Sequence, residues 1–127
     1  MTSPSPIEPF AAGLFLPECP RWHAGALWLC DMWGHAVLRF SEAGERTLVH
    51  RFPDDEDPGG LGWLPDSSAE GALLVVGMEG RCVYRFEGGG AGGNEGGGAK
   101  PRVHADLSAL APWPCNDMIV RRDGTAW

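Results

Sequence analysis

The sequence predicts an all-β fold built from repeated four-stranded units, and three observations support this prediction. Residues 25–40 (GALWLCDMWGHAVLRF) and 71–86 (GALLVVGMEGRCVYRF) align without a gap, 46 residues apart, with eight of sixteen positions identical. The 19 glycines and 11 prolines predict many turns and leave little room for a long helix. A period of about 40–50 residues with strand-like content is typical of the blades of a β-propeller.

Each repeat contains four short runs that are rich in β-branched, aromatic or leucine residues. Turn residues such as Gly25, Gly34 and Gly44 separate these runs, so successive strands should pair antiparallel in an up-and-down sheet. The expected strands are residues 21–23, 27–31, 36–40 and 47–52 in the first repeat, and 61–64, 73–77, 82–86 and 102–106 in the second.

A third repeat begins near Asn116, with expected strands at 118–120 and 125–127 around an Asp-Gly turn. Six blades with this period would need about 276 residues, so we expect a six-bladed propeller truncated to about two and a half four-stranded blades. A ten-strand sandwich is the alternative, but it would not explain the repeat. The expected division is a flexible leader (1–13) and a partial propeller (14–127), with blade 1 at about 18–53, blade 2 at about 60–107 including a Gly-rich insertion (88–98), and the start of blade 3 at 116–127.

Composition and charge narrow the classes of function. Hydrophobic residues make up 43% of the chain and charged residues 21%, which are values for a globular protein. The net charge of −7 argues against nucleic acid or an anionic membrane as a partner, because both require a basic surface. The start of the chain resembles no signal peptide, and no uninterrupted apolar run reaches membrane-spanning length, so we expect a cytoplasmic protein with free, mostly buried cysteines.

Three residues stand at equivalent places ahead of the first strand of each repeat. These are Glu18 in PECPRW, Gly60 in PGGLGW and Asn116 in PCNDMIV. The first strand of a propeller blade is its innermost, so these positions would surround a shared axis. A carboxylate and an amide there are oxygen ligands of the kind that hard cations prefer. Two oxygens do not make a metal site, however, and both side chains could instead bond loop backbone groups.

Other polar residues have simpler explanations. The acidic run 54–57 lacks the ligand alternation of a calcium-binding loop and is expected to be a solvated loop. Asp31 is expected to bond its own turn. The residues Trp22, Trp28, Trp33 and Trp63 are expected to pack between blades.

Several segments in the same order resemble the senescence marker protein/regucalcin/gluconolactonase family, from about residue 14 onward. They are PRWHAGALWLCDMWGHAVLR, GLGWLPD, ALLVVGMEGRCVYR, HADLSALAP and NDMIVRRDG. The resemblance implies a six-bladed propeller and metal-dependent hydrolysis of sugar lactones and related esters. It implies that Glu18 is a metal ligand, because it matches the family's glutamate before Pro-x-Trp. It implies that Asn116, which matches the asparagine opening the third blade, contacts substrate or the metal-bound water, and we assign it as the substrate-binding residue.

Differences between this sequence and the family's pattern limit which residue roles can be transferred to it. The family's other ligands and its catalytic aspartate lie in later blades, so no catalytic residue is expected in this chain. Pro114 stands where characterised members often have arginine, which leaves the substrate open. Cys19 replaces the usual small residue after the glutamate.

The resemblance therefore predicts the N-terminal part of a gluconolactonase-like enzyme, inactive as this fragment. A divalent cation is the implied cofactor, with calcium preferred over zinc or manganese, and the partner is a small sugar lactone. Three alternatives stay open. One is a non-catalytic propeller module that associates through its open blade faces, and another is a strictosidine-synthase-like propeller with the same blade pattern. The third is a nonfunctional fragment.

Overall fold

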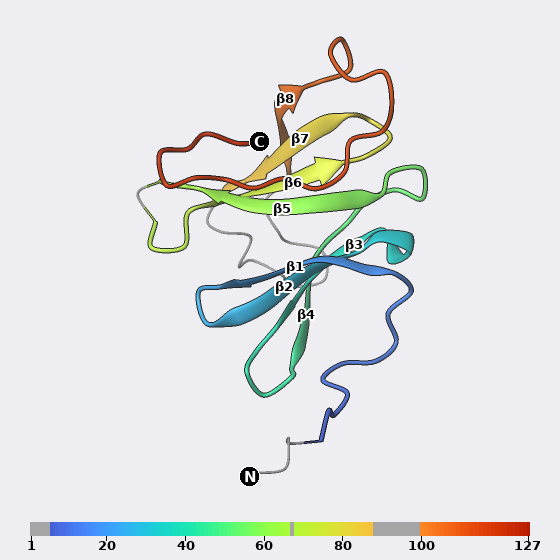
Figure 1. Cartoon of the computed structure of the whole chain (residues 1–127), viewed down its shortest axis with the longest axis vertical. Coiled ribbons are helices and arrows are strands. Elements are labelled where there is room, and N and C mark those ends of the chain that lie inside the picture. The colour runs from blue at the N-terminus through green and yellow to red at the C-terminus, as the bar shows by residue number, and fades with distance from the viewer. Residues whose placement is uncertain (1–5, 67, 88–99) are drawn as a thin grey trace.

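A computed structural model describes residues 6–66, 68–87 and 100–127, and it contains two four-stranded antiparallel sheets stacked face to face (Figure 1). The predicted all-β, blade-type fold is confirmed. In each sheet the strands are paired in chain order. The first sheet holds β1 (Pro17–His23), β2 (Ala26–Asp31), β3 (Ala36–Phe40) and β4 (Arg46–Arg51), with a 3₁₀ turn η1 (Met32–Gly34); the second holds β5 (Pro58–Leu64), β6 (Ala72–Gly77), β7 (Cys82–Phe86) and β8 (Arg102–Asp106).

All eight strands of the first two repeats lie where the sequence predicts them. Strands β3, β7 and β8 have the expected bounds, whereas β1 and β5 begin three to four residues earlier than expected, at Pro17 and Pro58. The predicted Gly-rich insertion (88–98) lies outside the described residues. Among those residues, no helix is long and apolar enough to cross a bilayer.

The strand register reproduces the sequence repeat. Leu27 pairs with Phe40 in the first sheet, and Leu73 pairs with Phe86 in the second, one period later. Cys30 with Val37 and Val76 with Val83 repeat in the same way. Because a slip of one residue would reverse every side chain between the two faces, this agreement fixes which residues face the neighbouring sheet.

The core lies between the two sheets. Trp28, Cys30 and Val37 of the first sheet form one buried cluster with Leu61, Leu73, Val75 and Phe86 of the second. The Trp63 ring packs edge-on against Trp28 with ring centroids 5.4 Å apart. Trp28 and Trp63 therefore pack between blades as predicted, but Trp22 and Trp33 do not, since they are 60% and 64% exposed.

The outer face of the first sheet is covered by the segment that precedes it. Ala11 and Leu14 pack against the cluster of Leu29, Ala36, Leu38 and Phe40, and the Phe10 ring packs edge-on against Phe40. The buried Asp31 carboxylate accepts hydrogen bonds from the backbone N–H groups of Phe15 and Leu16, at 2.9 and 2.8 Å. The prediction that Asp31 bonds its own turn is thus wrong, because the incoming segment offers unpaired donors.

The third repeat covers the outer face of the second sheet. Figure 1 shows this segment, in dark red, running along β5. Met118, Val120 and Cys115 pack on Leu74, Val76 and Val83. The two expected strands are reduced to one isolated bridge between Val120 and Ala126, flanked by hydrogen bonds between Ile119 and Trp127.

Glycines in β5 allow the third repeat to approach closely. A Cβ at Gly60 would lie 2.9 Å from the Asn116 carbonyl oxygen and 2.9 Å from the Met118 nitrogen. A Cβ at Gly62 would collide with the Val120 side chain. Any larger residue at these two positions would push the third repeat away from the sheet.

Replacing Gly60 by alanine should therefore destabilise the chain by about 1–3 kcal/mol, because backbone atoms cannot move aside cheaply. Gly59→Ala should cost less, since its Cβ would meet the flexible Met78 side chain first, at 2.8 Å. Urea unfolding of both variants would measure this difference. Equal stability of the two variants would contradict the close approach at Gly60.

Candidate functional site

The first segments of the three repeats are β1, β5 and the residues from 115 onward, and the first strand of a propeller blade is its innermost. We call the N-terminal ends of these innermost segments, at residues 17–19, 58–60 and 115–117, the leading ends. Glu18 pairs with Cys30, and Gly60 pairs with Val76, the residue one period after Cys30. Glu18 and Gly60 therefore occupy equivalent positions in their sheets. Strands β1 and β5 contact each other, and the Asn116 backbone lies against Gly60, so the three leading ends adjoin.

The Cys19 thiol lies where the three leading ends meet. Its sulfur accepts a hydrogen bond from the Leu61 N–H at 3.1 Å and donates one to Asp117 Oδ1 at 3.0 Å. The strand register shifts between Glu18 and Arg21, as in a β-bulge, and Cys19 has a φ of 51°. Burial, followed by the hydrogen bond to Asp117, raises the pKa of this thiol to about 12. The sulfur is therefore a neutral structural group and no nucleophile.

Asp117 receives donors from two repeats. The Arg21 guanidinium reaches its two carboxylate oxygens at 2.8 and 3.1 Å and also donates to the Met118 carbonyl. The Met118 N–H donates to Oδ1 at 2.7 Å. Burial acts to raise the pKa of Asp117, but the hydrogen bonds from Cys19, Met118 and Arg21 outweigh it and lower this pKa. Asp117 is thus ionised across the neutral range.

Glu18, the predicted metal ligand, and Asn116, the predicted substrate-binding residue, take no direct part in these hydrogen bonds; their neighbours in the chain do. Glu18 and Asn116 are both exposed, and each directly precedes one partner of the Cys19–Asp117 hydrogen bond. No side-chain hydrogen bond of either residue is found in the described part of the chain, so neither is occupied by loop backbone groups there. Within the same ranges, no group of three or more His, Cys, Asp or Glu side chains could hold a metal ion.

The acidic run 54–57 is only partly a solvated loop. Asp54 and Asp55 are exposed as predicted, but Glu56 is 8% exposed and Asp57 lies 2.8 Å from His35 Nδ1. The Glu56 carboxylate accepts hydrogen bonds from the Glu79 and Gly80 N–H groups and from the Tyr84 hydroxyl. Glu56 and Asp57 therefore have partners within the two blades, and their carboxylates are not free to form a cation-binding loop.

Glu56 and Asp31 place carboxylates at matching points of the two blades. A Cβ at Gly34 would lie 2.5 Å from Asp31 Oδ2, and a Cβ at Gly80, one period later, would lie 2.5 Å from Glu56 Oε2. Where the first blade has Asp31, the second has Gly77, whose missing side chain leaves room for Glu56. The same acceptor is supplied from two different places in the sequence.

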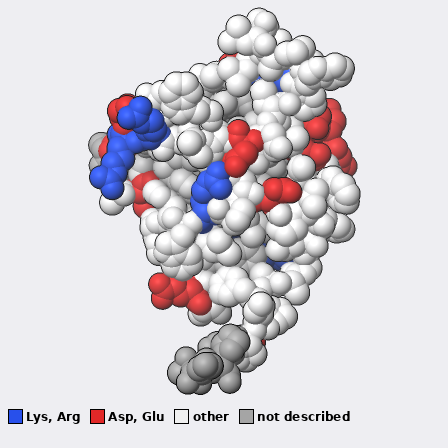
Figure 2. Space-filling model, viewed as in Figure 1, with Lys and Arg blue, Asp and Glu red and all other residues white. Residues whose placement is uncertain are grey.

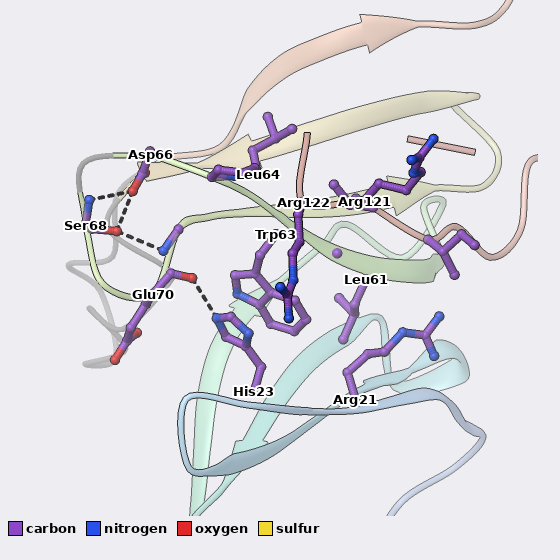
Figure 3. A pocket seen from close by; sticks show the side chains of 15 residues that line it. Arg21, His23, Leu61, Trp63, Leu64, Asp66, Ser68, Glu70, Arg121 and Arg122 are labelled. Atoms are coloured by element: carbon purple, nitrogen blue, oxygen red, sulfur yellow. Dashed lines mark hydrogen bonds between the residues drawn. The ribbon is translucent and has the colours of Figure 1, made fainter. Parts of the chain in front are cut away.

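A separate open pocket of about 460 Å³ lies at the other ends of the innermost segments (Figure 3). The His23 ring stacks on Trp63 with centroids 4.0 Å apart, and its Nε2 lies 2.6 Å from the Glu70 carbonyl oxygen. Figure 3 shows Arg122 reaching down toward Trp63, whereas Arg121 points away. Neither this pocket nor a second one of about 510 Å³ beside Phe52 and Tyr84 includes Glu18 or Asn116.

The face of the molecule shown in Figure 2 carries mixed charge. On the face shown in Figure 2, basic side chains gather mainly in two places and acidic side chains are scattered. Arg21 lines the pocket of Figure 3 and also reaches Asp117, so it connects the two ends of the innermost segments.

The hydrogen-bonded network of Cys19, Arg21 and Asp117 is not predicted by the sequence analysis. Two signals were available: Asp117 directly follows Asn116, and Cys19 directly follows Glu18. Their contact, nearly 100 residues apart in the chain, could not be read from spacing.

One of three comparisons with known proteins found a match, and it agrees with the fold. The model of one family, described as the SMP-30/Gluconolactonase/LRE-like region, matches residues 16–127. Searches of curated proteins and of solved structures gave no match.

The chain has one tyrosine, so its absorbance titration reports Tyr84 alone. Burial and then the nearby Glu56 charge raise the pKa of Tyr84 from 10.0 to about 12. This pKa is higher in the folded chain than in the unfolded chain. The contribution of Tyr84 to the free energy of unfolding is therefore fully present below pH 10 and is lost as the pH rises toward 12. We expect Glu56→Gln to lower the titration midpoint, since it removes one carboxylate charge.

Glu79→Gln is the matched control, because Glu79 bonds the Asp57 N–H and makes no hydrogen bond to Tyr84. Its midpoint should stay at the wild-type value. A wild-type midpoint near 10.0 would contradict the partly buried position of Tyr84 beside Glu56.

Proposed function

The chain belongs to the SMP-30/gluconolactonase/LRE-like family, and from this premise we propose that it is the N-terminal part of a metal-dependent sugar-lactone hydrolase of the gluconolactonase type. Its substrate class would be a small cyclic ester. The observation that supports a shared site most directly is the contact between the first and third leading ends, where Cys19 Sγ and Asp117 Oδ1 are 3.0 Å apart.

Glu18 is the proposed metal ligand. Its carboxylate is exposed at the leading end of β1, where it can reach an ion without displacing a protein partner. A carboxylate suits hard divalent cations, with calcium preferred here over zinc or manganese. When bound, such a cation polarises the lactone carbonyl and lowers the pKa of a water ligand.

Asn116 is the proposed substrate-binding residue. Its amide has two donors and an acceptor, which match the hydroxyl and ester oxygens of a sugar lactone. The backbone of Asn116 is held against Gly60, so the side chain starts from a fixed point. Gly60 itself offers no side chain to the site, because the third repeat occupies the space a Cβ would need.

The remaining parts of the site would come from elsewhere. A carboxylate and an amide fall short of the six to eight oxygen ligands that calcium takes. We therefore propose that further ligands and the general base lie outside residues 1–127, and that these residues alone bind a cation weakly and hydrolyse no lactone.

Calorimetric titration with Ca²⁺ and Mn²⁺ would test the role of Glu18. We expect weak binding by the wild-type chain and a loss of at least about ten-fold in affinity for Glu18→Gln, because one charged oxygen ligand is removed. Glu42→Gln is the control: it removes the same charge from an exposed position in the turn between β3 and β4.

A lactone-hydrolysis assay with the same chain and metals completes the test. Hydrolysis should stay at the uncatalysed rate. Turnover by residues 1–127 that survives Glu18→Gln would refute the proposed role. Equal losses of affinity in Glu18→Gln and Glu42→Gln would reduce it to nonspecific charge attraction.

A further inference from the structure

We propose that Cys19 is a positioning residue: its thiol holds the leading end of the third repeat against that of the first, so that Asn116 stays beside Glu18. This inference rests on the proposed function, which gives Glu18 and Asn116 their roles.

The thiol is suited to this role because it bonds two repeats at once. A thiol can donate one hydrogen bond and accept another. Cys19 accepts from the Leu61 N–H of β5 and donates to the Asp117 carboxylate of the third repeat, at 3.1 and 3.0 Å. Since Cys19 itself belongs to β1, one side chain joins all three leading ends.

The backbone of β1 directs the thiol to this point. The register shift between Glu18 and Arg21 interrupts the regular alternation of side chains, and Pro20 has no N–H to add to the ladder. A bulge of this kind re-aims a side chain. Here the side chain that follows Glu18 points into the contact between repeats, where it is 5% exposed.

Through Asp117 the thiol acts on Asn116. The Asp117 carboxylate is bonded by Cys19 and Arg21, while the Asn116 carbonyl oxygen and the Met118 nitrogen lie against Gly60. The peptide that carries Asn116 is therefore restrained on both sides, by β5 and by the first repeat. Loss of the carboxylate contacts would free one side.

Burial decides which contact matters most. The side chains of Arg21 and Asp117 are 29% and 54% exposed, so their ion pair is open to solvent and salt. The Cys19 sulfur is buried, and water cannot replace its two hydrogen bonds without opening the contact between the repeats. The thiol is thus the part of this network that solvent does not replace.

The experiment uses the 127-residue chain with three substitutions. Cys19→Ala removes both hydrogen bonds, whereas Cys19→Ser keeps a donor and an acceptor at the same place. Cys30→Ala is the matched control, because Cys30 is a buried thiol of the same core cluster with no hydrogen bond to Leu61 or Asp117. Amide hydrogen exchange without metal is measured first, followed by Mn²⁺ affinity from electron paramagnetic resonance.

We expect Cys19→Ala to speed exchange at the Leu61 and Met118 amides by roughly ten-fold relative to the rest of the sheets. Its Mn²⁺ affinity should fall about ten-fold, as for other groups that orient a ligand. Cys19→Ser should restore most of both values. Cys30→Ala should change exchange at these two amides no more than elsewhere and leave Mn²⁺ affinity near the wild-type value.

Unchanged exchange in Cys19→Ala would overturn the proposal, and so would raised exchange with unaltered Mn²⁺ affinity, or equal effects of Cys30→Ala. Absence of Mn²⁺ binding by the wild-type chain would instead contradict the proposed function. Faster exchange in Cys19→Ala alone would then still establish that the thiol holds the third repeat.

Discussion

The structure depends on the close approach of three backbone segments at their leading ends. Glycines at positions 59, 60 and 62 remove the side chains that would keep the third repeat away from β5. The space so released is filled by the Asn116–Met118 backbone and by the Val120 side chain, while the Cys19 thiol bonds Leu61 and Asp117 beside it. The positions of the candidate metal ligand Glu18 and of the candidate substrate-binding residue Asn116 follow from this packing, because both are neighbours of the residues that make it.

The two blades show how a repeat can keep its geometry while its chemistry diverges. Both place a carboxylate against the glycine of the turn after their second strand, Gly34 in one and Gly80 in the other. In the first blade this carboxylate is Asp31, which binds the segment before β1; in the second it is Glu56, which binds the turn and Tyr84. Similarly, the first blade carries Glu18 at a position where the second has Gly60. The repeat thus preserves the sheet, and its two copies differ at the positions of these carboxylates.

Much of the fold could be predicted from the sequence because it depends on local patterns. Period and strand-forming runs located all eight strands, and Trp28 and Trp63 were predicted to pack between blades. What could not be predicted depends on partners far away in the chain. Asp31 was expected to bond its own turn because the donors of Phe15 and Leu16 lie outside its local sequence. Glu56 was included in a solvated loop because charge alone does not reveal the space left by Gly77.

The candidate site divides in the same way. Glu18 and Asn116 are predicted as site residues from their positions near the start of the first strand of a repeat and from a family resemblance. The family itself is confirmed by the match over residues 16–127. The Cys19–Asp117 contact required coordinates, because neither residue has a spacing that implies the other. The third repeat was expected as two strands but forms one isolated bridge, since the described residues offer it no sheet partner beyond its own turn.

Paramagnetic broadening of backbone amide signals by a trace of Mn²⁺ measures most directly whether Glu18 and Asn116 face one ion. If they do, the amides of both leading ends, around residues 18 and 116, should lose intensity together, while those of His23, Trp63 and Arg122 at the opposite ends stay sharp. Broadening centred on the exposed turn between β3 and β4, or confined to a single leading end, would contradict a shared site.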